Sequence, residues 1–183
     1  MDATYTLPGR RRSALLGLTL LLGGCGGLRL DDYADATPRF DPRVFFAGQV
    51  HAWGIVQDWR GRVVRRFDVD IAGRREGDGV VLVEDFVYAD GERDERTWRI
   101  APADGGGFTG RADDIIGTAA GETRGNAMRW RYEMDLVVDG RSWRVAFDDW
   151  MWQLDERQLF NRSYIRKFGF TVAEVSIFMQ RVD

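Results

Sequence analysis

The stretch that decides the fold runs from residue 128 to residue 151 and reads Met128-Arg-Trp-Arg-Tyr-Glu-Met-Asp-Leu-Val-Val-Asp-Gly140-Arg-Ser-Trp-Arg-Val-Ala-Phe-Asp-Asp-Trp-Met151. Apolar and charged residues alternate on both sides of Asp139-Gly140, as they do in strands whose successive side chains point to opposite faces. An Asp-Gly pair between two alternating segments is a strong hairpin signal. The stretch therefore predicts two antiparallel strands joined by a tight turn.

The same rhythm extends over most of the chain. From Gln49 onward, strand-like stretches alternate with turns rich in Gly and Asp, including a second Asp-Gly turn at Asp90-Gly91. No comparably long segment has helical periodicity with caps. We predict an all-β domain, an antiparallel up-and-down barrel of about nine or ten strands, because closure removes exposed strand edges. A sandwich of two sheets would satisfy the same pattern and stays open as an alternative.

Composition limits the function classes. The chain has 183 residues, a formal net charge of −3, one His and one Cys. This length suits one globular domain, and the charge gives no support to nucleic-acid binding. A single Cys excludes an intrachain disulfide framework, and one Cys with one His argues against a zinc site. We expect no cofactor and no metal.

The N-terminus has the features of an export signal. Arg10, Arg11 and Arg12 precede an uncharged apolar run over residues 13–22, which is too short to cross a membrane as a helix. Leu22-Gly23-Gly24-Cys25 resembles the bacterial lipobox, which implies cleavage before Cys25 and lipidation of its sulfur. The sequence thus predicts a signal peptide over 1–24, a lipidated tether and leading segment over 25–48, and the barrel domain over 49–183. A buried Cys in an apolar helix and a twin-arginine signal are the less favoured interpretations.

Several motifs in the mature chain also resemble a known family. They are Trp53-Gly-Ile-Val-Gln-Asp, Glu84-Asp-Phe-Val-Tyr-Ala-Asp-Gly91, Gly125-Asn-Ala-Met-Arg-Trp-Arg-Tyr132, Phe147-Asp-Asp-Trp-Met151 and Lys167-Phe-Gly169. Together they resemble the bacterial lipoprotein family catalogued as domain of unknown function 3833. The resemblance implies an exported lipoprotein with a lipocalin-like barrel, and it carries no established activity. The residue after Cys25 is Gly26 and not Asp, which in lipoproteins of this kind implies onward transport to the outer membrane. We therefore expect a lipid-anchored envelope protein facing the periplasm.

Two carboxylates fall in phase with apolar faces. Glu84 shares parity with Leu82 and Phe86, and Asp149 shares parity with Phe147 and Met151. If those faces line the lumen, the charges need compensation from Arg99, Arg162, Lys167, water or a ligand. The alternatives are a structural ion pair, or a bulge that turns the carboxylate outward. The predicted ligand-binding residues are Glu84, Tyr88, Trp98, Arg99, Asp149 and Arg162.

Three functions stay open from the sequence. The favoured one is a binding protein that holds a fatty acid or lipid in the barrel, with the membrane contacted through lipidated Cys25. The second is an accessory lipoprotein that acts on an unidentified protein partner through an exposed aromatic patch, possible members being Trp150 and Trp152. The third is a lipid-modifying enzyme acting through Glu84 or Asp149. Adjacent carboxylates such as Asp148-Asp149 point to opposite faces of a strand, so no catalytic residue is assigned.

Overall fold

The computed structural model describes residues 27–138 and 140–182. The predicted signal peptide and Cys25 lie outside these residues. A 3-10 turn, η1 (Leu30–Tyr33), and one helical turn, α1 (Pro42–Phe45), precede ten strands. The strands are β1 (Gly48–Asp58), β2 (Val63–Glu76), β3 (Gly79–Tyr88), β4 (Arg93–Pro102), β5 (Phe108–Arg111), β6 (Ile115–Arg124), β7 (Ala127–Val138), β8 (Arg141–Gln153), β9 (Gln158–Lys167) and β10 (Phe170–Arg181).

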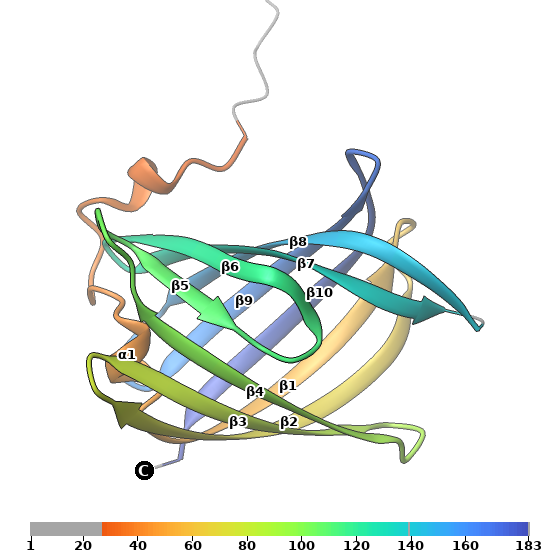
Figure 1. Ribbon diagram of the computed structural model, residues 1–183, viewed down its shortest axis with the longest axis horizontal. Coiled ribbons are helices and arrows are strands. Elements are labelled where there is room, and N and C mark those ends of the chain that lie inside the picture. The colour runs from red at the N-terminus through yellow and green to blue at the C-terminus, as the bar shows by residue number, and fades with distance from the viewer. Residues whose placement is uncertain (1–26, 139, 183) are drawn as a thin grey trace, which may run out of the picture.

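Each strand pairs antiparallel with the next, and β1 pairs with β10, so the sheet closes into a barrel (Figure 1). The deciding stretch forms the β7–β8 hairpin, in which Tyr132 lies opposite Phe147 and Met134 opposite Val145. The closed sheet confirms the predicted all-β barrel and excludes the two-sheet sandwich. Among the described residues, no helix is long and apolar enough to cross a membrane.

One end of the barrel is closed by the segment that contains α1 (Figure 1). Phe40, Phe45 and Phe46 are almost fully buried there and meet edge to face, with Phe45 and Phe46 ring centroids 5.1 Å apart. Gly73 of β2 allows this close approach, because a Cβ at that position would lie 1.6 Å from the carbonyl oxygen of Phe46. The closed end is therefore packed as a core.

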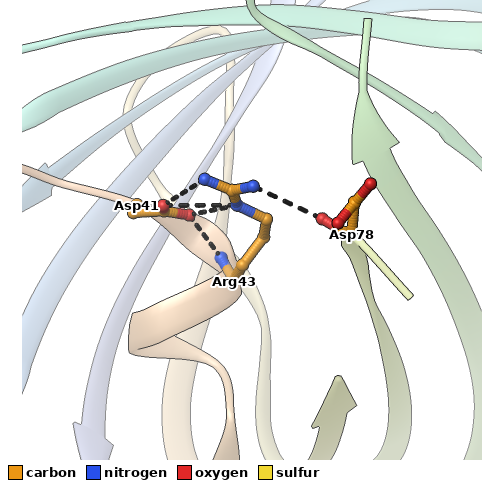
Figure 2. A network of polar contacts seen from close by, with 3 residues as sticks. All are labelled: Asp41, Arg43 and Asp78. Atoms are coloured by element: carbon orange, nitrogen blue, oxygen red, sulfur yellow. Dashed lines mark hydrogen bonds and ion pairs between the residues drawn. The ribbon is translucent and has the colours of Figure 1, made fainter. Parts of the chain in front are cut away.

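Polar contacts hold α1 in place. Pro42 occupies the first turn, where its missing N–H costs nothing, and Asp41 caps the helix by accepting from the backbone N–H of Arg43 at 2.9 Å. The Arg43 guanidinium donates to Asp41 and to the carbonyl oxygen of Asp78, as Figure 2 shows. This hydrogen bonding lowers the pKa of Asp41. From the other end of the sequence, Arg181 donates to the carbonyl oxygens of Val44 and Phe45.

The opposite end is the mouth. Because β1 starts beside α1 and the strands run up and down, the mouth carries the hairpin turns β1–β2, β3–β4, β5–β6, β7–β8 and β9–β10. Lumen-facing residues become more accessible toward it: along β3, Leu82 is buried whereas Phe86 and Tyr88 are half-buried. The interior side chains are thus fully buried near α1 and only partly buried toward the mouth.

Candidate binding site in the barrel lumen

A polar cluster lies in the lumen between the closed end near α1 and the mouth. Glu84 on β3 lies directly opposite Arg96 on β4, and Asp149 on β8 lies opposite Ser163 on β9. Tyr132 on β7 is buried beside Trp98, at 5.3 Å between ring centroids. Five different strands therefore bring these polar groups into one region of the interior.

Arg96 is the cation of this cluster. Its guanidinium Nε and Nη2 bind Asp114 Oδ2 at 2.8 and 2.6 Å, and its Cζ lies 6.0 Å from the ring centroids of both Phe86 and Trp98. Asp114 belongs to the β5–β6 turn at the mouth and its side chain is 40% exposed. Arg96 therefore joins the rim to the interior, and its single positive charge is already paired with Asp114 at the rim.

Asp149 has an incomplete set of hydrogen bonds. The residue is 7% exposed, and its Oδ1 atom has no partner among the described residues. Ser163 hydrogen-bonds to Asp149, but the Ser163 hydroxyl also donates to Asn161 Oδ1 at 3.1 Å. A hydroxyl has a single proton to donate. The one proton of the Ser163 hydroxyl can therefore serve only one of its two acceptors, Asp149 or Asn161, at a time.

The electrostatics of the lumen agree with this geometry. Burial raises the pKa of Glu84 to about 7, although the positive charge of Arg96 acts in the opposite direction. Burial also raises the pKa of Asp149 to about 7, against the effects of the Ser163 hydrogen bond and of Arg96. Burial keeps the pKa of Tyr132 well above its ordinary value, so the phenol is neutral. Near neutral pH, each carboxyl can therefore present either an acceptor or a donor.

Four of the predicted site residues face the lumen. Glu84 and Asp149 point inward, and neither β3 nor β8 shows a register shift over its described length, which excludes the bulge alternative. Trp98 is buried against Trp130, at 5.7 Å between ring centroids. Tyr88 lies nearer the mouth, half-buried, with the Arg65 guanidinium 3.4 Å from its ring centroid.

The other two predicted residues lie on the outer wall, so their expected contribution to the lumen is wrong. Arg99 has a side chain that is 62% exposed and lies 4.0 Å from Glu76, and Arg162 is exposed beside the outward ring of Phe160. Both follow an inward-facing neighbour, Trp98 and Asn161, and therefore point to the other face of the wall. Lys167, the third candidate cation, lies near the mouth with its Nζ 3.6 Å from the Trp143 ring centroid.

The residues missed from the sequence are Arg96, Asp114, Tyr132 and Ser163. The hairpin signal could have revealed the first, because Glu84 and Arg96 are equally distant from Asp90 of the Asp90-Gly91 turn. Asp148, in contrast, points outward and accepts from Arg129 at 2.6 Å, so adjacent Asp148 and Asp149 form no dyad, as predicted. Within the described residues, no group of three or more His, Cys, Asp or Glu side chains could hold a metal ion.

A closed ten-stranded antiparallel barrel with a polar cluster in its interior has the architecture of a lipocalin-like barrel. The chain matches, over residues 19–181, the family described as "Protein of unknown function (DUF3833)", and it belongs to that family. This confirms the resemblance drawn from the motifs. No curated protein matches the chain.

Proposed function

We propose that this chain is a lipid-anchored protein of the bacterial envelope, held through Cys25 in the outer membrane facing the periplasm, and that it binds a fatty acid or lipid in the barrel. The observation that carries the binding proposal is Asp149, a buried carboxyl whose free oxygen faces the lumen. A buried polar atom without a partner is costly, and a ligand head group that hydrogen-bonds to it would remove that cost.

The lining of the lumen supports an amphipathic ligand. Apolar side chains around the polar cluster and toward the mouth remain only partly buried, namely Val56, Phe86, Ile115, Leu136, Ala173 and Ile177. An apolar lining with a few convergent polar groups is the usual design of a small-molecule site. In the proposed complex the head group reaches Glu84, Arg96 and Asp149, and the apolar chain lies against the lining nearer the mouth.

The head group can be a carboxylate because the cluster has donors for it. Arg96 supplies guanidinium N–H groups, and Glu84 and Asp149 supply O–H groups when they are protonated, which a pKa of about 7 permits at neutral pH. The ionised forms of the same carboxyls would repel a carboxylate. Fatty-acid binding by this cluster is therefore tied to its protonation.

Binding is tested by titrating the purified protein with dodecanoate and following tryptophan fluorescence at pH 6.5. Arg96→Gln should weaken binding by about tenfold, because a charge-assisted hydrogen bond contributes roughly 1.5–3 kcal/mol. Arg99→Gln is the matched control, since Arg99 lies on the same strand but points outward. Equal losses in both variants, or no saturable binding by the unsubstituted chain, would refute the proposed lumen site.

The anchor is tested separately by the intact mass of the protein extracted from bacterial membranes. Cleavage before Cys25 with an added diacylglycerol and an N-acyl chain is the expected product, and Cys25→Ser should leave an unprocessed, unacylated chain. Several acyl chains hold a protein stably on a bilayer, at about 0.8 kcal/mol per buried methylene. A mature chain without added acyl mass would overturn the anchor and leave the binding proposal intact.

A further inference from the structure

A row of aromatic side chains crosses the outer wall of the barrel. Trp152 on β8, Phe160 on β9, Phe178 on β10 and Trp53 on β1 lie directly opposite one another in register. The Trp152 and Phe160 rings are stacked 6.3 Å apart, and the Phe178 and Trp53 rings are stacked 6.1 Å apart. We call these four residues the aromatic row.

The aromatic row belongs to the outside of the barrel. Its members alternate along their strands with lumen-facing residues, such as Asn161, which is 2% exposed, and Met179, which is 7% exposed. Trp53 is 45% exposed, whereas Trp152, Phe160 and Phe178 are half-buried. A shallow hollow of about 570 Å³ adjoins the row; its lining is mainly apolar and includes Ile55, Val87, Phe160 and Phe178, together with the polar Ser176.

Other parts of the outer wall have a different composition. On the neighbouring strand β7, the outward positions Arg129, Arg131, Glu133 and Asp135 are charged, and Val137 near the mouth is apolar. A large apolar patch on a soluble protein usually marks a surface that contacts a partner or a membrane. The aromatic row is such a patch, and it is confined to one side of the barrel.

The N-terminal segment places one end of the row close to the proposed anchor. Tyr33 packs on Trp152 at 6.1 Å and on Trp150 at 6.4 Å between ring centroids, and Trp150 is only 2% exposed. Of the two Trp residues suggested from the sequence for an exposed patch, Trp150 is therefore covered. Tyr33 follows Cys25 by eight positions, so the lipid anchor can lie no more than roughly 28 Å away even with the chain fully extended.

The charges near the row suit a phospholipid surface. The exposed Arg162 lies 5.9 Å from the ring centroid of Phe160, and Arg66 borders the hollow. Asp68, which lies opposite Trp53, borders the same hollow as Arg66, and next to it on the same face Asp70 binds His51 at 2.6 Å. Trp with Arg is the composition that anchors proteins at membrane interfaces, because the rings lie at head-group depth and the cations attract anionic lipids.

We propose that the aromatic row lies on the surface of the bilayer that holds the lipid anchor, so that the protein contacts the membrane at two places and rests on the side of its barrel. This inference rests on the proposed anchor at Cys25. The occupant of the row is phospholipid; a second copy of this chain would be the competing occupant.

The test measures lipid contact by fluorescence quenching in the acylated full-length protein. Ser176→Cys places a bimane label in the hollow, and Ala120→Cys, exposed on β6 across the barrel, is the matched control. Acylated Cys25 has no free thiol and the chain has no other Cys, so each variant takes one label. Both are reconstituted in vesicles of phosphatidylethanolamine and phosphatidylglycerol, with and without phospholipid that has a nitroxide on its acyl chain.

The label at 176 should be quenched at least about threefold more than the label at 120, because only the former would contact the bilayer. Adding Trp53→Ser and Phe178→Ser should abolish the difference while intact mass still shows acylation. Equal quenching at both positions would overturn the proposal, as would energy transfer between labelled copies without lipid quenching. If the intact mass shows no acyl chains, the proposed anchor at Cys25 is wrong. In that case the same labelled protein is mixed with vesicles, and quenching at position 176 then decides whether the aromatic row binds lipid by itself.

Discussion

Asp148 and Asp149 are neighbours in β8, but Asp148 on the outer wall has cationic partners whereas Asp149 in the lumen has an oxygen without a partner. Both are buried, at 5% and 7% exposed. On the outer wall, Asp148 is bound by Arg129 at 2.6 and 2.8 Å and by Arg166 at 3.2 Å. In the lumen, Asp149 has an oxygen without a partner and a pKa raised to about 7. A buried carboxylate therefore stabilises the fold where arginines pair with it, and opposes folding where its oxygen is left without a partner.

The largest expected effect is on stability at pH 8. Asp149→Asn should raise the free energy of unfolding by on the order of 2–4 kcal/mol, because it removes a charge that burial disfavours. The folded carboxyl loses its proton near pH 7 and the unfolded one near 3.8. The raised pKa therefore stabilises the protein fully below about pH 4, and this contribution is lost as the pH rises to about 7. Urea unfolding at pH 8 and pH 4 measures the change, which should vanish at pH 4.

Asp148→Asn is the matched substitution on the outer wall, and its effect should have the opposite sign. Loss of a charged acceptor for Arg129 and Arg166 should lower the free energy of unfolding by about 1–3 kcal/mol at pH 8. The two arginines are 34% and 43% exposed, so water can rehydrate them and limit the loss. If both variants changed stability in the same direction, the contrast between the two faces would be wrong.

The next effect, on ligand affinity, is smaller. Dodecanoate should bind on the order of tenfold more tightly at pH 6 than at pH 8, because Glu84 and Asp149 take up protons in this range and stop repelling the ligand. Titrations followed by tryptophan fluorescence give the profile. The double variant Glu84→Gln with Asp149→Asn should flatten it, and dodecanol, which has no charge, should show little pH dependence in the unsubstituted protein. Tighter dodecanoate binding at pH 8 would exclude the proposed head-group site.

The smallest effects compare two neighbours on β9. Ser163→Ala removes the hydrogen bond that lowers the pKa of Asp149, so that pKa should rise above 7 and the free energy of unfolding should fall by about 1 kcal/mol. Arg162→Gln, on the outer wall, should change stability by no more than about 0.5 kcal/mol. Carboxyl NMR titration and urea unfolding provide the two measurements. A larger loss for Arg162→Gln than for Ser163→Ala would contradict the assignment of the faces.

Local sequence rules predicted much of this molecule because strands and hairpins are local structures. Parity alone placed Glu84 and Asp149 on the inner face, and Asp90-Gly91 and Asp139-Gly140 marked two of the mouth turns. The charges of Arg99 and Arg162 alone suggest partners for the two carboxylates, but their parity opposite to Trp98 and Asn161 puts them on the outer wall. The cation that meets Glu84 is Arg96, whose parity with Trp98 and distance from Asp90 are readable in the sequence.

Other features depend on chain closure, which local patterns do not encode. The pairing of Trp53 with Phe178 joins strands from the two ends of the domain, so the aromatic row arises only when β1 meets β10. The cover that Tyr33 places on Trp150 and Trp152 likewise depends on where the leading segment runs. The pairing of strands far apart in the sequence therefore determines which aromatic rings are exposed. The alternation of side chains along each strand determines only which face of the wall the rings occupy.

The bonds from Arg181 to the carbonyl oxygens of Val44, Phe45 and Ala47 have a consequence for how the domain is made. They join the last residue of β10 to the segment around α1 that precedes β1, so the closed end of the barrel is complete only after the whole domain has been synthesised. Contacts of such high sequence separation form late and slow the folding of β proteins. Until β1 and β10 pair, both remain free strand edges, which makes that interval the period of greatest exposure to aggregation.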